Sequence, residues 1–413
     1  MPYNEPICDF ERNGVANMPN QKHVNRMYCL LQMGYWGMLA SFTAYQSAVL
    51  LDRGFSSSDV GVFLAIGCLS GMIFMPLIGN WADRHPEVPV KRLFLGLMIP
   101  TLIINFLFFF TRPGWWGTAA VFFLLGVLET NSFPLIDSMA MQFINAGMDI
   151  QYSTGRGLGA FAYAVVCVLV GQQTARFGIQ TAMLTHGVLI VAMMLIVSLF
   201  PLFPRAALSA TEERKATHSA LQVLRANPPF TVMLFGAFFG MIAIMPITNF
   251  LVTMVADHGG DSGHLGLAQF LMAASELPGA YLVQKFHRRY GSEKVVLVSL
   301  VFMAAKPLLI LFSGSLTMLL LVQPIQMLGY GLFTPVSTYY TNENVAPEDR
   351  MQGQSLKMVI TTGCGSMAGN LVSGWAIDMG GVPLMLTICT VSGCIGLCLG
   401  LLAARLRRRQ AAV

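Results

Sequence analysis

Charged residues are scarce in this chain. Asp, Glu, Lys and Arg together make up 11% of the 413 residues, whereas 55% are hydrophobic and the mean hydropathy is +0.62. Soluble domains carry about 25% charged residues, because much of their surface must be polar. The composition therefore excludes a large water-soluble protein and predicts one that lies in a lipid bilayer.

Motifs of catalysis and of metal binding are missing as well. The eight cysteines are scattered and form no Cys-x-x-Cys pair, which argues against a zinc site or a disulfide framework. The chain has no His-Glu-x-x-His, no Gly-x-Ser-x-Gly and no glycine-rich phosphate loop. The group Asp257, His258, Asp261 and His264 fits no standard metal-ligand spacing. We therefore expect neither an enzyme nor a bound cofactor or metal, and nothing in the sequence suggests a nucleic-acid partner.

Twelve apolar stretches, each long enough to cross a bilayer, fill most of the chain. Their expected ranges are 27–51, 59–82, 93–111, 115–142, 155–175, 179–203, 230–256, 265–286, 294–313, 316–341, 354–377 and 382–404. The predicted organisation is an N-terminal tail (1–26), a six-helix bundle (27–203), a linker (204–229), a second six-helix bundle (230–404) and a basic tail (405–413). The predicted fold is thus an all-α integral membrane protein with twelve transmembrane helices. For the linker, we favour a plain solvated segment over the alternative of a short interfacial helix at Ser219–Arg225.

Basic residues fall almost entirely on one side of the predicted membrane. Of the 25 Lys and Arg residues, only Arg53, Arg112 and Arg176 lie on the side away from the termini, and Arg156 and Lys306 lie inside spans. Basic loops tend to stay in the cytoplasm. Both termini are therefore predicted to be cytoplasmic, in a multi-pass protein of the inner membrane.

The two halves of the chain repeat each other weakly. Gly155-Arg-Gly-Leu158 is followed sixteen residues later by Gly171, and Gly353-Gln-Ser-Leu356 is followed sixteen residues later by Gly369. The matching order at matching span positions indicates two related six-helix bundles with a binding site between them.

Charged residues within the predicted spans are few, and five of them, in both halves of the chain, are placed in the membrane rather than at its surface. They are Glu129, Asp137, Arg156, Glu276 and Lys306. A charge at the centre of a bilayer costs at least ~2.5–3.5 kcal/mol, so it survives where it faces a partner or a watery cavity. We expect these side chains to line a solute pathway.

The loop after the second span carries a recognisable motif. It reads Gly79-Asn-Trp-Ala-Asp83-Arg84, with Lys91 and Arg92 following. This resembles the signature loop of the major facilitator superfamily, although His85-Pro86-Glu87 replaces the usual Gly and basic residue. A small residue at Gly79 permits close helix approach, and the Asp83 carboxylate is expected to cap or pair across a neighbouring helix end. Gly79, Asp83 and Arg84 are thus the residues of this loop that we expect to serve conformational change.

More of the chain resembles the lactose-permease-like branch of that superfamily. The matching runs include Leu51-Asp-Arg-Gly-Phe-Ser, Pro134-Leu-Ile-Asp137 and Tyr152-Ser-Thr-Gly155-Arg156-Gly-Leu-Gly159. The resemblance implies that Asp137 and Arg156 hold substrate hydroxyls and that Tyr163 stacks on a sugar face. Arg156 and Tyr163 are seven residues, or about two helical turns, apart and therefore share a face. We expect Asn131 to line the same cavity.

The second half resembles this branch at Ser275-Glu276-Leu-Pro278, and Lys306 stands where the branch has a basic residue. It departs from the branch at Gln326 and Gly329, where lactose permease has a His followed by a Glu. Neither residue titrates, so a transported proton must sit on another buried carboxylate. We expect Glu276 to carry it, with Lys306 as a movable partner, and Asp137 and Glu129 are the alternatives.

Simpler interpretations remain for these residues. In that case the charged residues form structural ion pairs, Asp137 with Arg156 and Glu276 with Lys306, and the aromatic rings serve packing alone.

The leading functional hypothesis is a secondary transporter that moves a sugar or oligosaccharide by alternating access, with proton symport. The alternatives are an organic-anion or other metabolite transporter working by uniport or export, and a non-transporting sensor. The expected partners are the solute, the proton and the bilayer, and we expect a monomer.

Overall fold

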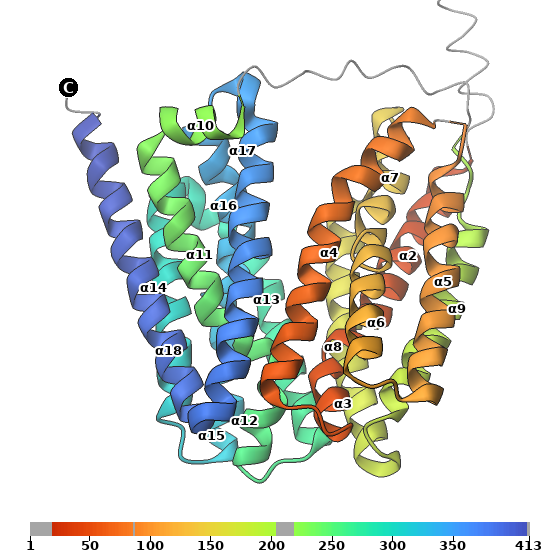
Figure 1. The fold of residues 1–413 in the computed structure, drawn as a ribbon. Coiled ribbons are helices and arrows are strands. Elements are labelled where there is room, and N and C mark those ends of the chain that lie inside the picture. Colours follow the sequence, from red (N-terminus) through yellow and green to blue (C-terminus); the bar gives the residue numbers. More distant parts are fainter. Residues whose placement is uncertain (1–18, 86, 204–218, 411–413) are drawn as a thin grey trace, which may run out of the picture.

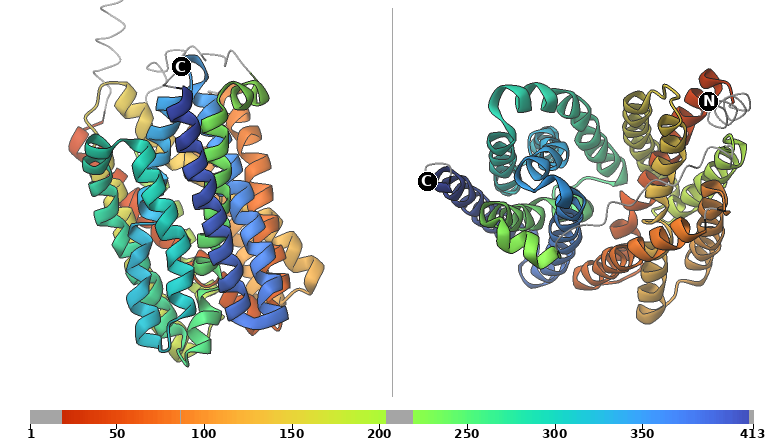
Figure 2. Two further views of the ribbon diagram at one scale, coloured as in Figure 1. Left: turned by 90° about the vertical axis from the view of Figure 1, so that its left-hand side faces the viewer. Right: turned by 90° about the horizontal axis from the view of Figure 1, so that it is seen from above.

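The computed structural model describes residues 19–85, 87–203 and 219–410, and this described part is helical without strands. The helices form two groups that stand side by side, one built by each half of the chain (Figures 1 and 2). The all-α prediction is therefore confirmed. Residues 1–18 of the predicted N-terminal tail and 204–218 of the linker lie outside the described residues, whereas the end of the tail, from Gln21, already belongs to the first described helix.

The first group contains eight labelled helices. They are α2 (Gln21–Thr43), α3 (Gln46–Asp52), α4 (Ser57–Arg84), α5 (Val90–Thr111), α6 (Trp115–Leu128), α7 (Ser132–Asn145), α8 (Tyr152–Phe177) and α9 (Thr181–Leu199). Breaks at 44–45 and at 129–131 divide two of the expected spans, so α2 with α3 and α6 with α7 each make one crossing. These eight helices therefore supply six crossings.

The second group is more irregular. It contains α10 (Ala220–Ala226), α11 (Pro228–Asn249), α12 (Leu251–Asp257), α13 (Ser262–Tyr290), α14 (Ser292–Leu311), α15 (Leu316–Val322), the 3₁₀ helix η2 (Gln323–Met327), α16 (Tyr330–Asn344), η3 (Pro347–Asp349), α17 (Arg350–Lys357), the π-helix η4 (Met358–Gly365) and α18 (Ser366–Gln410). The long α18 is two helices joined by a kink at Gly380 and Gly381, where Gly381 has a φ of 71° that favours glycine.

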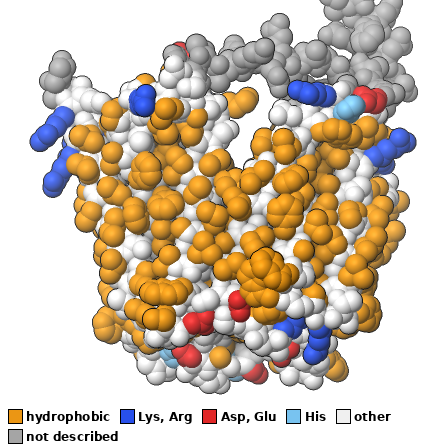
Figure 3. Space-filling model, viewed as in Figure 1, with side chains coloured by type: hydrophobic (Ala, Val, Ile, Leu, Met, Phe, Trp, Pro, Cys, Tyr) orange, Lys and Arg blue, Asp and Glu red, His pale blue; other side chains and the backbone are white. Residues whose placement is uncertain are grey.

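The described segments account for the expected membrane crossings. Nine described helical segments are long and apolar enough to span a bilayer. One of these segments contains α18, whose two limbs on either side of the kink make two crossings. The long but more polar helices α2 and α13 supply the remaining two. Apolar side chains cover the middle of the visible face, and charged side chains gather at its two ends (Figure 3). Trp116, for example, is 82% exposed, which is expected where the solvent is lipid.

The end of the predicted linker differs from expectation. Residues 220–226 form α10, which a capping box starts: the Ser219 side chain accepts from the backbone of Gln222, and the Gln222 side chain accepts from the backbone of Ser219. This reciprocal cap satisfies two N–H groups that a helix start otherwise leaves free. The favoured prediction of a plain solvated linker is therefore wrong for this end, and the alternative of a short helix at Ser219–Arg225 agrees with α10.

The two halves pack closely at the end away from the termini. There α4 lies against the first limb of α18, and α8 lies against α13. A Cβ atom added to Gly171 would lie 2.9 Å from the Cα of Gly266, and Gly61 similarly abuts the backbone of Asn370. Side chains larger than hydrogen cannot fit at these crossings, so glycine is what allows the halves to meet there.

The opposite end, where α2 begins and α18 ends, is open between the halves. The ribbons diverge toward it in Figure 1, and the space-filling view in Figure 3 is hollowed there. Gly79, near this end of α4, would meet nothing within 4 Å if it carried a Cβ. The close helix approach expected at Gly79 is therefore absent in this conformation, whereas Gly61 on the same helix is tightly packed.

Candidate functional site

A polar and aromatic cluster lies in the first half, on one face of α2. Tyr28, Gln32 and Trp36 are four residues apart, which places them on one stripe of the helix. The Gln32 amide donates to the Tyr28 hydroxyl at 2.9 Å and to Asp137 Oδ1 of α7 at 3.2 Å, and Trp36 Nε1 donates to Gln32 Oε1 at 3.1 Å. Asp137 is thereby tied to α2 by an amide rather than by a cation.

Arg156 of α8 joins this cluster through aromatic rings. Its guanidinium carbon lies 5.2 Å from the ring centre of Trp36 and 5.0 Å from that of Phe133. Among the described residues no ion pair within 4.0 Å joins Arg156 to Asp137, and the buried Nη1 atom of Arg156 has no hydrogen-bond partner. The guanidinium is therefore held by cation–π contacts, with a buried N–H left over to donate.

Tyr163 lies on the same face of α8 as Arg156 and reaches the other half. Its hydroxyl is 3.4 Å from Thr43 Oγ1, and its ring stands edge-on to Trp36 with the centres 6.4 Å apart. It also interacts electrostatically with Glu276 of α13. The cluster of the first half thus faces the charged residues of the second half where α8 packs on α13.

Lys306 of α14 is fully buried and has partners that sequence reasoning did not assign. Its amine donates to Gln326 Oε1 of η2 at 2.8 Å and contacts Met272 Sδ of α13 at 3.3 Å. Glu276 interacts electrostatically with both Lys306 and Gln326, but no ion pair within 4.0 Å joins Glu276 to Lys306 in the described part of the chain. In this conformation Gln326, at one of the departures from the lactose-permease pattern, is the direct partner of the lysine.

Glu129 and Asn131 occupy the break between α6 and α7. Both side chains are buried, and the Asn131 amide donates to the Val127 carbonyl at 2.7 Å. Glu129 Oε1 lies 3.8 Å from Nε2 of His186, a residue of α9 that the sequence analysis did not select. A histidine inside an apolar span is itself a signal, since intramembrane ionisable groups are rare.

The signature-loop residues end α4 at the open side. Gly79 and Arg84 are exposed, and the side chain of Asp83 lies outside the described residues. His85 Nδ1 lies 2.6 Å from Glu87 Oε1. The predicted role of this loop in conformational change stays a prediction.

Two of the acidic and histidine residues near the start of α13, Asp261 and His264, cap that helix. Asp261 accepts from the backbone N–H of His264 at 3.0 Å, and the two side chains contact each other at 2.6 Å, so they cap the helix. The same backbone hydrogen bond lowers the pKa of Asp261. Within the described residues, no group of three or more His, Cys, Asp and Glu side chains is arranged to hold a metal.

Known proteins resemble this chain over most of its length. A maltose permease from Geobacillus stearothermophilus is 24% identical over 352 residues, which cover 83% of this chain and 86% of that protein. The fold resembles the crystal structure of the nucleoside transporter NupG, with a TM-score of 0.79, 17% identity and coverage of 92% of this chain and 98% of that one. A bacterial homologue of the human lysosomal transporter Spinster, solved inward-facing and unoccupied, matches with a TM-score of 0.67, 15% identity and coverage of 94% and 96%.

The family profile gives the assignment. The description "MFS_1 like family" matches residues 27–386, which include all the charged spans discussed above. A transporter rather than an enzyme therefore accounts for the two bundles, the apolar belt and the buried charges within each half. The chain belongs to the MFS_1-like family and is a multi-pass transporter of the major facilitator superfamily.

Proposed function

We propose that the protein is a secondary active transporter of a polar organic solute, with a sugar or oligosaccharide as the favoured class. The observation that carries this proposal is the cluster of Asp137, Arg156 and Trp36, which faces Glu276 through Tyr163. A carboxylate, a guanidinium with a free N–H and aromatic rings are groups that bind sugar hydroxyls and apolar sugar faces. The similarity to a maltose permease supports this class.

An organic anion is the second candidate solute. Arg156 has no carboxylate partner within 4.0 Å among the described residues, and Nη1 has no hydrogen bond. A carboxylate of a solute would form a charge-assisted hydrogen bond with that nitrogen. Lys306 is a less suitable group for binding an anion, because its side chain is fully buried and its amine already donates to Gln326.

The orientation of the open groove follows from the charge distribution. With both termini in the cytoplasm, as the basic residues predict, the groove opens inward and the packed glycine crossings close the external side. Alternating access then requires Gly61 and Gly171 to separate from their partners and Gly79 to approach the second half. In this movement the two bundles rock about the central cluster, and the end that carries the signature loop closes.

Proton symport is assigned to Glu276. This carboxylate is near enough to interact with Tyr163 on the solute side and with Lys306 and Gln326 behind it. A proton on Glu276 would remove its attraction for Lys306, which Gln326 already holds. The Glu276→Gln variant is therefore expected to lose uphill accumulation while keeping exchange of labelled solute.

Binding by purified protein tests the solute class. We expect maltose or another disaccharide to raise the thermal unfolding temperature, whereas uridine and citrate represent the nucleoside and organic-anion alternatives. Arg156→Lys should weaken the stabilising ligand about 10- to 100-fold, because Lys cannot reproduce the planar fork. The matched control is Arg176→Lys on the exposed surface of the same helix. Unchanged binding in a protein with both Arg156→Lys and Asp137→Asn would favour the structural interpretation of these residues.

A further inference from the structure

Glu129 and His186 form a buried pair that the transport scheme above does not use. Glu129 is 4% exposed and His186 is fully buried. Glu129 Oε1 and His186 Nε2 face each other at 3.8 Å, and neither atom has a hydrogen-bond partner. Two facing atoms of buried titratable groups that both lack a hydrogen-bond partner require an explanation, because each unsatisfied polar atom is costly there.

The surroundings of the imidazole fix where its hydrogen lies. His186 Nδ1 is 3.1 Å from the carbonyl oxygen of Met38 and 3.2 Å from the hydroxyl oxygen of Ser41. That hydroxyl donates its own hydrogen to the Met38 carbonyl at 2.6 Å. Nδ1 therefore faces two acceptors and carries the hydrogen, so Nε2 of the neutral ring presents a lone pair to Glu129.

An ionised Glu129 and this tautomer repel each other through two lone pairs. One added proton removes the conflict, either as Glu129–O–H donating to Nε2 or as Nε2–H⁺ donating to the carboxylate. In both arrangements the pair changes from a net charge of −1 to zero. The 3.8 Å separation would then shorten toward the ~2.7–2.9 Å of a charge-assisted hydrogen bond.

The pair is mechanically connected to the solute cluster. His186 is tied to α2 at Met38 and Ser41, one turn beyond Trp36, and Glu129 ends α6 at the break that precedes α7 and Asp137. Tyr35 of α2 is close enough to both sites to link them, since it interacts electrostatically with Glu129 and also with Asp137 and Arg156.

Among the described residues, the other polar and aromatic neighbours of the pair carry no further charge. Asn131 and Ser132 are the polar neighbours on the chain, and Asn105 of α5 donates to the Met183 carbonyl one turn before His186. On α2 the ring of Phe42 stacks on the imidazole at 5.1 Å. Besides the pair itself, Tyr35 is therefore the titratable residue on the surrounding described helices that interacts with Glu129.

We propose that Glu129 and His186 together bind one proton, and that this proton sets the pH dependence with which the α2–α7–α8 cluster binds its solute. The proposal rests on the transport function above but concerns a site distinct from Glu276. A bound proton draws α9 and the start of α7 together and shifts Asp137 against Gln32. It regulates solute affinity and is not the transported proton.

Nitrogen NMR of protein carrying ¹⁵N-labelled histidine tests the proton site without any solute. His186→Gln assigns the signal among the seven histidines. We expect Nδ1 to carry a hydrogen at every pH. On acidification, Nε2 should change from a nitrogen without a hydrogen bond to one that either accepts a hydrogen bond from protonated Glu129 or is itself protonated. In Glu129→Gln the amide donates permanently, so Nε2 should be hydrogen-bonded at every pH. An Nε2–H tautomer with a bare Nδ1, or an identical titration in Glu129→Gln, overturns the proposal.

Maltose affinity in the Glu276→Gln background tests the regulatory role, since that background removes the coupling carboxylate. We expect the dissociation constant to change about fivefold between about pH 6 and about pH 8, as one hydrogen bond predicts. Adding either Glu129→Gln or His186→Gln should abolish this change of the dissociation constant with pH. Two variants are used so that the test still holds if one of them fails to fold. Persistent pH dependence in both double variants refutes the regulation. Absence of maltose binding in the wild type would instead contradict the proposed solute class and leave the NMR result to decide the proton site.

Discussion

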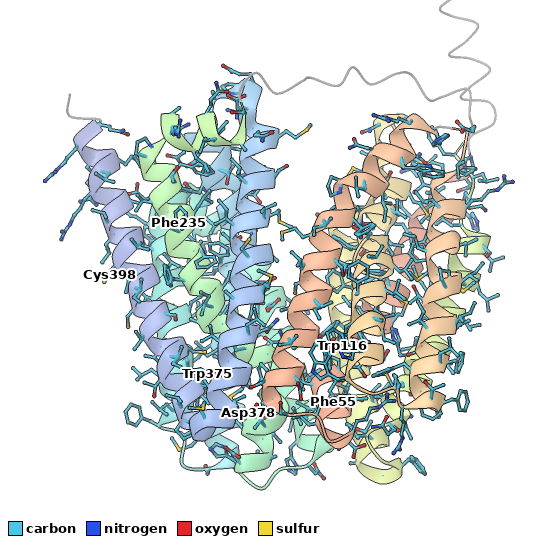
Figure 4. The ribbon with its side chains drawn as sticks, in the orientation of Figure 1. Phe55, Trp116, Phe235, Trp375, Asp378 and Cys398 are labelled. Atoms are coloured by element: carbon cyan, nitrogen blue, oxygen red, sulfur yellow. The ribbon has the colours of Figure 1, made fainter. Side chains whose placement is uncertain are left out.

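Removing the charge of Asp378 should loosen the closed end of the protein. Asp378, at the end of the first limb of α18, accepts the backbone N–H of Ser57 at 3.0 Å and that of Ser58 at 2.7 Å (Figure 4). These two N–H groups belong to the first turn of α4, where a helix has no internal acceptors for them. The carboxylate of one half therefore caps a helix of the other, and opening this end must break both bonds.

The size of the effect follows from the geometry. A hydrogen bond to a charged group contributes ~1.5–3 kcal/mol when buried, but Asp378 is exposed and water competes for it. Asn keeps one acceptor and loses the charge that favours a helix N-terminus. Asp378→Asn should therefore cost the closed end about 1.5 kcal/mol, which increases the open fraction about tenfold.

Alkylation of an introduced cysteine measures that fraction. Val252 lines a cavity of about 190 Å³ between the halves at this end, together with Ile179 and Leu265. In Val252→Cys protein, a membrane-impermeant maleimide added from outside should react about tenfold faster when Asp378→Asn is present. Asp378→Asn without the new cysteine gives the background of the eight native cysteines, and Asp257→Asn, an exposed carboxylate near the same end, is the charge control. Equal rates with and without Asp378→Asn would refute the capping argument.

Three further changes test other parts of the structure. Gly266→Leu should open the same end and raise Val252→Cys labelling more than Gly96→Leu, because a Cβ at 266 meets the Cys167 carbonyl at 2.5 Å whereas Gly96 has open space. Asp261→Ala should lower the unfolding temperature slightly at neutral pH. Because the pKa of Asp261 is depressed in the folded state, its contribution is present above the unfolded pKa of about 4 and disappears as the pH falls through the folded value, so the two proteins should converge in acid. Reporter fusions after Leu208 and after Val413 should both report the cytoplasm, and an external signal from either would contradict the assigned orientation.

Hydropathy predicts the all-α membrane class and the positions of the long helices, whereas the arrangement in two bundles follows from the internal repeat and the family resemblance. Lipid selects long apolar helices so strongly that the span predicted at 179–203 and the helix observed at Thr181–Leu199 nearly coincide. The breaks at 44–45 and 129–131 were not predicted, because an interrupted apolar run has the same composition as a continuous one. The short helix α10 coincides with the less favoured alternative for Ser219–Arg225, and the capping-box spacing of Ser219 and Gln222 is the signal that supports it.

The partners of the buried charges could not be read from the sequence. Arg156 was paired with Asp137 by their order in a family pattern, but Gln32, from another helix, is what contacts the aspartate. Lys306 was paired with Glu276, whereas the amine donates to Gln326 in the short η2 helix. Such pairings depend on how helices rotate against one another, and a single sequence does not contain that information. The roles of these residues in solute binding and coupling stay predictions.

Solute uptake by reconstituted protein tests the central claim most directly. Proteoliposomes with wild-type protein should accumulate labelled maltose when the outside is acidified, and this uptake should be accompanied by proton entry. Arg176→Lys should behave like the wild type, and Arg156→Lys should reduce the initial rate about 10- to 100-fold. Wild-type rates in Arg156→Lys, or a wild-type protein that takes up uridine or citrate but not maltose, would contradict the account.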